Sequence, residues 1–357
     1  MPIPDLNSRH ILLIRTDRLG DVILSTPVAT ALKKAFPQSR ISFLVREYTR
    51  PVVESCPAVD DILVVDPFTG ANGRLRTRHL ARFLQEREVD AAIHLFPRAS
   101  LAWATYLAKI PLRVGTGFRL YSFLFNRRLY EHRKTAQFHE AEYNLHLLKL
   151  LGLENLVVEF CLRVNPSAAA SMAIKARDAG LEVEGDFVVM HPGSGGSSRD
   201  WPVESFARLA DLIMDRHHLP VVITGDRKDA AIIRRLKSLM RRKPIDFGGR
   251  LSLQELAALL KQASLFISNS TGPLHLAVAL DTEVLAFYPP IRECRPQRWG
   301  PYGRPDDVLM SQTEECFRCR KSSNRWCECM QRITVDAAYD KVSRKLAYTL
   351  NRKYPTP

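Results

Sequence analysis

The sequence has no apolar run as long as the roughly 18 to 20 residues that a membrane-spanning helix needs. Its first ten residues also lack the basic segment and the apolar segment of a signal peptide. Internal repeats and low-complexity tracts are absent, which excludes solenoid and fibrous architectures. From these absences we expect a cytoplasmic protein whose seven cysteines are reduced.

The chain has fewer acidic than basic residues. The chain has 38 Asp and Glu residues against 52 Lys and Arg residues, and its formal net charge is +14. Such an excess favours anionic partners, namely nucleic acid, acidic lipid surfaces or phosphorylated small molecules. Basic residues gather at 74–82 and 127–134, where an anionic acceptor or a membrane would be met, and at 234–243, which we interpret as a solvated helix face.

The 357 residues suit two domains of ordinary size, and the order of predicted elements supports this division. Short apolar strands alternate with helical patterns in each half, which indicates two α/β domains with parallel, Rossmann-like sheets. The expected strands are 11–14, 41–45, 62–65, 90–95, 113–115, 187–190, 220–224, 265–267 and 284–287. We expect domains at 1–165 and 166–334, a long loop at 116–138, and a last helix in 335–357 that packs on the first domain.

Polar residues follow the first strand. Gly20 permits a tight turn, and Asp21 then lies at the start of a helix, at the carboxyl edge of the sheet where open α/β sheets bind ligands. The carboxylate of Asp21 suits a helix N-cap and suits a general base equally well. Asp17 is a second candidate carboxylate, and Arg18 lies beside it.

A glycine- and serine-rich loop follows the first strand of the second half. The backbone amides of 194–197 can approach phosphate oxygens, and Arg199 can hold a diphosphate through two hydrogen bonds. The loop does not end in the Gly-Lys-Ser/Thr of a Walker motif, nor does it match the dinucleotide GxGxxG register. The four loop residues predicted to bind phosphate are Ser194, Gly195, Gly196 and Ser197.

A similar arrangement follows the strand at 265–267. Ser270, Thr271 and Gly272 lead into a helix whose first turn contains a proline, and His275 lies one turn further on. This segment suits a nucleotide or sugar diphosphate, and His275 is a candidate ligand contact, although a structural histidine is the commoner case. Two such sheet edges facing one another predict a central cleft, which suggests group transfer.

Four cysteines cluster near the C-terminus, at Cys316, Cys319, Cys327 and Cys329. Their thiolates suit a structural zinc or a redox pair, but the cluster also fits reduced cysteines in a surface loop, and the Cys-x-Cys spacing departs from the usual pair of Cys-x-x-Cys motifs. Because Arg318, Arg320 and Trp326 lie among them, a nucleic-acid-binding ribbon is a further alternative.

Taken together, these stretches resemble the bacterial lipopolysaccharide heptosyltransferases of glycosyltransferase family 9, along nearly the whole chain. The resemblance rests on residues 19–27, on His191-Pro192-Gly193 with Arg199-x-Trp201-Pro202, on 247–249, and on 268–277. It implies a GT-B fold, with two Rossmann-like domains facing a central cleft, the acceptor on the first and the donor on the second.

The resemblance also implies transfer of a heptose from an ADP-activated donor to the lipopolysaccharide inner core, with inversion. By this resemblance Asp21 is the general base, Arg199 stabilises the leaving diphosphate, and Thr271, Gly272 and His275 contact the donor phosphates. Basic side chains of the first domain, namely Arg18, Arg127 and Arg128, are expected at a lipid-linked acceptor. No Asp-x-Asp dyad ends a strand, so we expect no catalytic cofactor or metal. We expect peripheral attachment at the inner face of the inner membrane.

One residue departs from the family pattern. Many heptosyltransferases carry an aspartate where this chain has Ser270, and a hydroxyl lacks the charge and the two acceptor oxygens of a carboxylate. A family-9 transferase with a different nucleotide-sugar donor is therefore one alternative. A basic, cysteine-rich nucleic-acid-binding protein is a more distant one.

Overall fold

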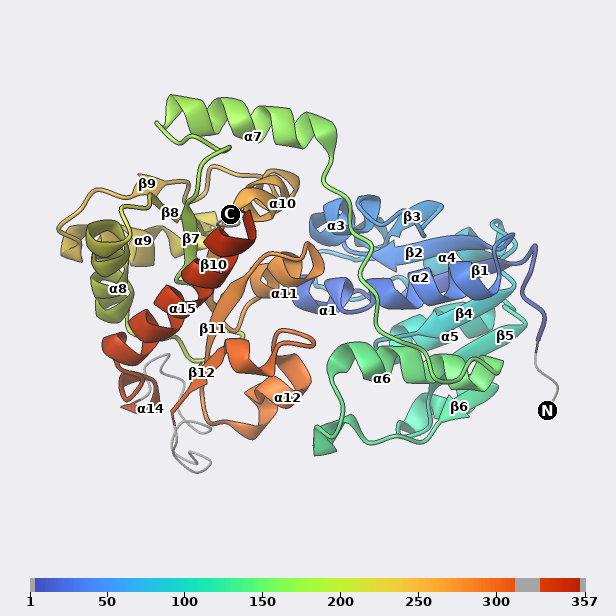
Figure 1. Cartoon of the computed structure of the whole chain (residues 1–357). Coiled ribbons are helices and arrows are strands. Elements are labelled where there is room, and N and C mark those ends of the chain that lie inside the picture. Colours follow the sequence, from blue (N-terminus) through green and yellow to red (C-terminus); the bar gives the residue numbers. More distant parts are fainter. Residues whose placement is uncertain (1–3, 312–327, 354–357) are drawn as a thin grey trace. The chain divides into compact units, whose positions relative to one another are not determined.

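The computed structural model describes residues 4–311 and 328–353 (Figure 1). The chain divides into two compact units, Met1–Arg163 and Val164–Pro357. The division lies two residues before the boundary expected from the sequence. Asn165, the last residue of the expected first domain, is the N-cap of a helix of the second unit, and its side-chain oxygen accepts from the amide of Ser167 at 2.9 Å.

The first unit contains a parallel sheet of six strands in the order β3-β2-β1-β4-β5-β6. All five residues of β1 are buried, as expected for a central parallel strand covered on both faces. The strands are β1 (His10–Ile14), β2 (Arg40–Val45), β3 (Asp61–Val64), β4 (Ala91–His94), β5 (Leu112–Thr116) and β6 (Arg127–Leu129).

The second unit repeats this architecture with the order β12-β11-β10-β7-β8-β9, again parallel. Its central strands β7 and β10 are buried throughout. The strands are β7 (Val188–His191), β8 (Val221–Ile223), β9 (Ile245–Asp246), β10 (Leu265–Asn269), β11 (Val284–Tyr288) and β12 (Val308–Met310).

Helices connect the strands in both units (Figure 1). Residues 19–35 form two helices and not one, because Pro27 lacks an amide hydrogen and cannot extend the first. The helices are α1 (Leu19–Ile23), α2 (Thr26–Ala35), α3 (Arg50–Glu54), α4 (Thr77–Gln85), α5 (Ala99–Leu107), α6 (Glu140–His146), α7 (Pro166–Asp178), α8 (Val203–Arg216), α9 (Ala230–Leu239), α10 (Leu253–Gln262), α11 (Gly272–Ala279), α12 (Pro296–Trp299), α14 (Glu328–Gln331) and α15 (Val335–Lys353).

The last helix, α15, corrects one expectation. It packs against α8, and its buried residues Ala338, Val342 and Leu346 belong to the hydrophobic core of the second unit. The side chains of His217 and Ser343 are also hydrogen-bonded at 3.1 Å. The sequence predicts this helix on the first domain, whereas its apolar face is buried within the second unit.

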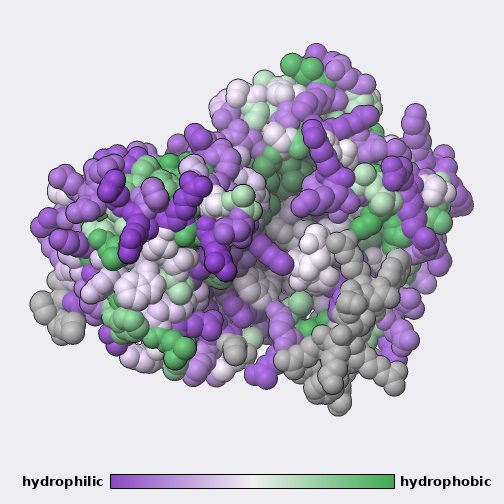
Figure 2. All heavy atoms as spheres, turned by 180° about the vertical axis from the view of Figure 1, so that it is seen from behind, coloured by the Kyte–Doolittle hydropathy of each residue, from purple (hydrophilic) through white to green (hydrophobic). Residues whose placement is uncertain are grey.

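The expected loop at 116–138 is also more ordered than predicted, since it contains the 3₁₀ helix η3 (Leu120–Leu124) and the edge strand β6. Within the described ranges, no helix combines the length and apolarity required to cross a bilayer. The face drawn in Figure 2 is mainly hydrophilic, with apolar residues in small groups.

Candidate active site

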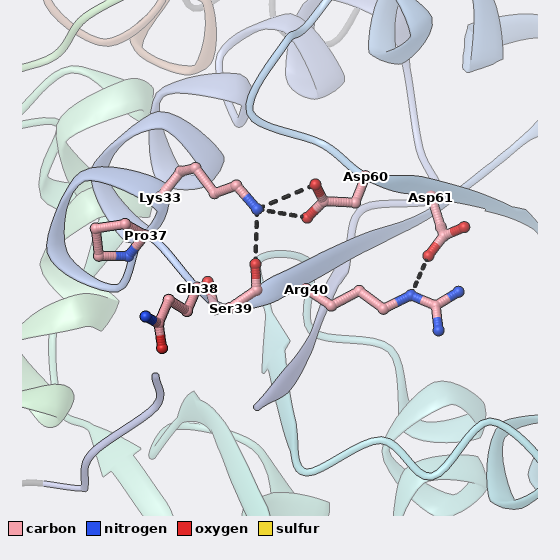
Figure 3. A pocket seen from close by; sticks show the side chains of 7 residues that line it. All are labelled: Lys33, Pro37, Gln38, Ser39, Arg40, Asp60 and Asp61. Atoms are coloured by element: carbon pink, nitrogen blue, oxygen red, sulfur yellow. Dashed lines mark hydrogen bonds and ion pairs between the residues drawn. The ribbon is translucent and has the colours of Figure 1, made fainter. Parts of the chain in front are cut away.

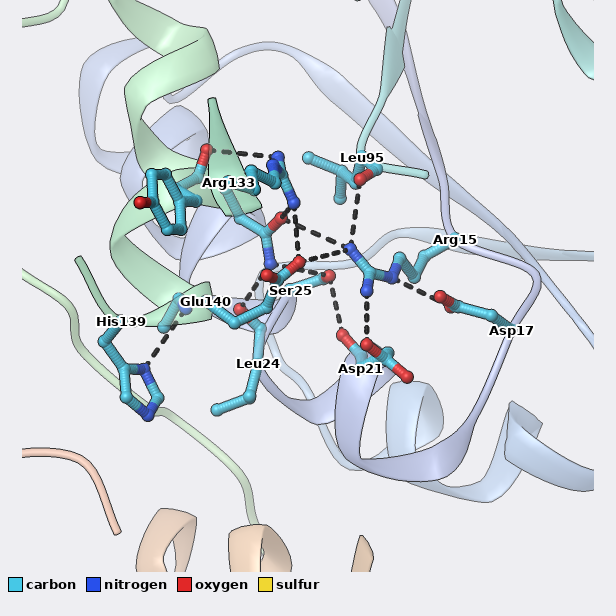
Figure 4. Close-up of polar contacts among 12 residues, drawn as sticks. Arg15, Asp17, Asp21, Leu24, Ser25, Leu95, Arg133, His139 and Glu140 are labelled. Carbon is cyan, nitrogen blue, oxygen red and sulfur yellow. Dashed lines mark hydrogen bonds and ion pairs between the residues drawn. The ribbon is translucent and has the colours of Figure 1, made fainter. Parts of the chain in front are cut away.

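The loop after β1 is organised by a buried arginine (Figure 4). Arg15 leaves the strand with its side chain almost fully buried. Its Nε atom lies 2.8 Å from Oδ1 of Asp17, and its Nη2 atom lies 2.5 Å from Oδ1 of Asp21. One guanidinium group thus fixes both candidate carboxylates of this loop.

The same guanidinium reaches a helix far along the chain. Arg15 Nη1 donates to Oε1 of Glu140 at 3.2 Å and to the carbonyl oxygen of Leu95 at 3.0 Å. Glu140 is 1% exposed, and Arg133 Nη1 also donates to its Oε1, at 2.6 Å. Because Glu140 begins α6, the helix dipole further favours its negative charge.

An asparagine completes the network. Asn144 Oδ1 accepts from Arg15 at 3.3 Å and from Arg133 at 3.0 Å, while its Nδ2 donates to the carbonyl of Leu24 at 3.0 Å. Next to it, the hydroxyl of Ser25 donates to the backbone oxygen of Asp21 at 2.8 Å. The turn that carries Asp21 is therefore held from both its side chain and its backbone.

Burial and charge determine the protonation of this cluster. Burial raises the pKa of Asp17 to about 6, and the opposing attraction of Arg15 does not cancel that effect. Burial lowers the pKa of Arg15, but the carboxylates of Asp21, Asp17 and Glu140 together outweigh it and the net shift is upward. Arg15 therefore stays charged, while Asp17 titrates close to neutral pH.

The capping interpretation of Asp21 is wrong. Arg18 is the N-cap of α1, and Asp21 is the third residue of that helix. Its carboxylate pairs with Arg15, and 14% of its side chain remains exposed. Asp21 is therefore both fixed in place and accessible to solvent.

The three arginines predicted at the acceptor are not together. Arg18 is exposed beside Asp21, whereas Arg127 and Arg128 lie in β6, three strands away from β1. Arg128 donates instead to the carbonyl oxygens of Phe125 and Phe123, at 2.9 and 3.4 Å. Arg15, Arg133, Glu140 and Asn144 were not predicted as site residues, because only the tertiary fold brings these distant positions together.

In the second unit, one amide holds two loops at the carboxyl edge of the sheet. Asn269 ends β10, and its Oδ1 accepts from the backbone amide of Trp201 at 2.8 Å. Its Nδ2 donates to the carbonyl oxygen of Pro192 at 2.6 Å. The Ser197 hydroxyl lies 2.6 Å from the carbonyl of Ser194 and 2.9 Å from that of Ser270, so the two predicted donor loops are in contact.

The glycines of the first donor loop meet two different requirements. A Cβ atom at Gly193 would lie 2.3 Å from Oδ1 of Asp229, so no side chain fits there. Gly195 and Gly196 have φ values of 58° and 79°, are exposed, and form a turn that other residues rarely adopt. Such turns present backbone amides to anions.

The second donor loop begins α11. Thr271 is the N-cap of this helix and Gly272 its first residue, so amide groups and the positive end of the helix dipole lie here. Ser270 and His275 are buried, and the Ser270 side chain is hydrogen-bonded to Tyr288, whose pKa is raised by burial. The half-buried Arg199 lies on the loop before Trp201.

The metal prediction falls mostly outside the described residues. Cys316, Cys319 and Cys327 are not among them, and Cys329 is buried in α14. Across 4–311 and 328–353, no cluster of His, Cys, Asp and Glu side chains is arranged to hold a metal ion.

A separate pocket lies at the opposite edge of the first sheet, where β2 and β3 begin (Figure 3). Its charged residues pair with one another: Lys33 Nζ lies 2.8 Å from Oδ2 of Asp60, and Arg40 pairs with Asp61. We assign it no role in the candidate site, because ligands bind at the carboxyl edge of such sheets.

Comparison with known proteins assigns the chain to a family. The sequence profile of Glycosyltransferase family 9 (heptosyltransferase) matches residues 77–329, which is well over half of the chain. The chain therefore belongs to this family of glycosyltransferases. The loop with Asp21 precedes the matched range.

Individual proteins agree with this classification. "Lipopolysaccharide heptosyltransferase 3" of Escherichia coli is 24% identical over 274 residues, covering 75% of this chain and 80% of the relative. A glycosyltransferase of family 9 from Veillonella parvula DSM 2008 has a solved structure with a TM-score of 0.83 at 23% identity, over 97% of this chain and 99% of that one. The structure of E. coli ADP-heptose lps heptosyltransferase II gives 0.77 at 20% identity, over 95% and 99%. These likenesses show a GT-B-like fold.

Proposed function

We propose that this protein moves a heptose from ADP-heptose to the inner core of lipopolysaccharide, with inversion and without a catalytic metal. The observation that carries the proposal is the carboxylate of Asp21, which Arg15 fixes at the carboxyl edge of the first sheet and which remains partly exposed. Family membership and the names of the relatives, which specify heptose and lipopolysaccharide, support the same reaction.

In the proposed mechanism, a sugar hydroxyl of the acceptor attacks the anomeric carbon of the donor. As the new C–O bond forms, the bond to the diphosphate breaks and Asp21 takes the hydroxyl proton. The leaving diphosphate gains negative charge. Arg199, the amides of 194–198 and the N-terminus of α11 stabilise that charge, since these groups are donors or carry positive charge before the reaction starts.

A second donor remains a candidate because of Ser270. Its hydroxyl is engaged with Tyr288, and it offers no negative charge to the donor. A nucleotide sugar other than ADP-heptose would keep the same base and the same phosphate-binding loops, so the choice of nucleotide is the point to measure.

The proposed acceptor is anchored in lipid, which brings the protein to a membrane surface. The basic first unit suits the anionic lipids at the cytoplasmic face of the inner membrane, and attachment would be peripheral. Raised salt should then release the protein from anionic vesicles, because screening weakens the attraction.

Calorimetric titration with ADP, UDP and GDP in metal-free buffer tests the proposal first. Selective binding of ADP, followed by transfer from ADP-heptose to a lipopolysaccharide core acceptor with an inverted anomeric product, is the expected result. Selective binding of UDP or GDP would move the proposal to the second donor. Binding of none of the three would reject both.

A further inference from the structure

One segment of the first unit combines aromatic and basic residues and contains no acid at all. Between Asp90 and Glu131 the sequence has no Asp or Glu, whereas eight of its forty residues are Phe, Trp or Tyr. The cations of this segment are Arg98, Lys109, Arg113, Arg119, Arg127 and Arg128. Its formal charge of +6 is nearly half of the net charge of the whole chain.

Helix α5 exposes large apolar side chains where a globular surface would carry polar ones. Trp103, Tyr106 and Leu107 are 41%, 47% and 43% exposed. Their spacing of three and four residues places them on one face of the helix. The opposite face, with Leu101 and Ala104, is buried in the core of the unit.

The 3₁₀ helix η3 extends this surface. Leu120 is fully exposed and Phe123 is 61% exposed. The ring centroids of Trp103 and Phe123 are 6.1 Å apart, so the apolar groups of α5 and η3 are continuous. We call the five residues Trp103, Tyr106, Leu107, Leu120 and Phe123 the aromatic patch.

Positive charge borders the aromatic patch. The guanidinium carbon of Arg113 lies 5.5 Å from the ring centroid of Tyr106, and Arg128 reaches the carbonyl oxygen of Phe123 at 3.4 Å. Lys109 and Arg119 are exposed in the same segment. Helix α4 packs beside α5, and it and the residues before it expose further arginines, namely Arg74, Arg76, Arg78 and Arg82.

We infer that the aromatic patch and its basic border dock this protein on an anionic bilayer. Aromatic rings are favoured at the level of the lipid headgroups, where one edge stays wet and the body is in an apolar environment. Leucine and phenylalanine add apolar area that enters the acyl boundary, and nearby Lys and Arg side chains are attracted to anionic lipid.

Charge complementarity favours an anionic bilayer, and not a second copy of this chain, as the binding partner of the aromatic patch. The segment from 91 to 130, with six cations and no acid, would repel a second copy of itself, whereas anionic headgroups neutralise it. The inference rests on the proposed function only for the lipid acceptor that gives docking a purpose. Docking itself depends on residues of the first unit, whereas the proposed donor loops belong to the second.

Sedimentation of the full-length protein with vesicles tests this inference. Vesicles of phosphatidylethanolamine with phosphatidylglycerol should bind the protein at low salt, and vesicles of phosphatidylcholine should bind it weakly. A double variant, Leu120→Ser with Phe123→Ser, should bind the anionic vesicles at least about tenfold more weakly, because both side chains lose their apolar contact with lipid. The charge variant Lys109→Glu with Arg119→Glu should do the same.

A matched control removes exposed apolar side chains elsewhere. Ile174 and Tyr348 are each 59% exposed in the second unit, and Ile174→Ser with Tyr348→Ser should bind vesicles as the wild type does. Equal sedimentation of the wild type and the patch variants would overturn the inference. Failure of the wild type to bind vesicles would also overturn it. So would a patch variant whose only change is conversion of an oligomer to a monomer in light scattering.

Nucleotide titration of the same proteins separates this inference from the proposed function. Patch variants that bind ADP normally but lose vesicle binding support docking through the aromatic patch. If the wild type binds vesicles through the patch yet binds no nucleotide, the proposed function fails and the docking inference stands. If the proteins bind ADP normally and the patch variants bind vesicles as the wild type does, the docking inference fails and the proposed function stands.

Discussion

The loops at the carboxyl edges of the two sheets are held by different kinds of side-chain contact. In the first unit, charged side chains pair with one another around Arg15, and Glu140 is shared by two guanidinium groups. In the second unit, neutral groups hold the corresponding loops through Asn269 and Ser197. Both units share the same strand order, so the contrast lies in the loops and helices that follow the strands.

This contrast separates two tasks. Paired charges in a buried network fix a carboxylate in one position, because breaking any pair leaves an uncompensated charge. A loop held by neutral groups instead leaves backbone amides and a helix N-terminus ready for an incoming anion. The first arrangement suits proton transfer and the second suits phosphate binding.

Removing the charge of Asp21 should have the largest effect on catalysis. We expect Asp21→Asn to lower kcat about a thousandfold, because an amide cannot accept the hydroxyl proton. Affinity for ADP should remain unchanged in calorimetry. Asp60→Asn, at the opposite edge of the same sheet, serves as the control and should keep its activity. Normal turnover by Asp21→Asn would remove Asp21 from the mechanism.

Neutralising Glu140 should have the next largest effect, on stability. Glu140→Gln leaves Arg15 and Arg133 without a shared counter-charge in a buried site, and we expect a loss of about 3 kcal/mol in the free energy of unfolding. Urea denaturation measures it. Glu159→Gln breaks an exposed pair with Lys34 and should leave the midpoint unchanged. Equal midpoints for the two variants would contradict a structural role of the buried network.

Adding one methyl group at Gly193 should disturb the second unit alone. Its Cβ would overlap the carboxylate of Asp229, and overpacking of this kind costs about 1 to 3 kcal/mol. We expect Gly193→Ala to raise the Kd for ADP about tenfold in calorimetry. Gly180→Ala, where the left-handed backbone is strained but the Cβ meets nothing within 4 Å, should leave the Kd unchanged. An unaltered Kd for Gly193→Ala would mean that the loop does not bind nucleotide.

The smallest effect concerns the pH dependence of stability. The pKa of Asp17 is about 6 in the folded protein, above its ordinary value of 3.8, so the folded state binds more protons between these values. Wild-type stability should therefore fall relative to Asp17→Asn as pH rises from about 4 to about 6. Denaturant titrations across this range measure the difference.

Asp61, a carboxylate whose pKa is lowered and not raised, provides the control for that measurement. The hydrogen bond with Arg40 lowers the pKa of Asp61, so its contribution to stability should be lost as pH falls, and Asp61→Asn should change the pH dependence with the opposite sign. A flat difference between the wild type and Asp17→Asn would contradict the raised pKa.

Sequence patterns predicted the strands and loops that are determined by residues close together in the chain. Central strands such as β1 and β10 are continuous apolar runs, so they were found, as were the polar loops that follow them. The edge strands β6, β9 and β12 contain only two or three residues each, which is too short for a periodic pattern to mark them.

The polar network around Asp21 could not be predicted in the same way. Its carboxylate was found through its position after a strand, but its partners were not. Glu140 lies 125 residues from Arg15, and residue spacing carries no signal over that distance. The two loops predicted to bind the donor contain short-range glycine and serine patterns, which sequence spacing does reveal.

The long separation between Arg15 and Glu140 has a consequence for biosynthesis. A growing chain that has emerged only as far as β5 contains Arg15 and Asp21 but lacks Glu140, the buried carboxylate that also pairs with Arg15. The loop therefore reaches its final geometry only once α6 has been made, which is after the whole first sheet and before any strand of the second. The order of translation thus completes the proposed base before the loops proposed to bind phosphate exist.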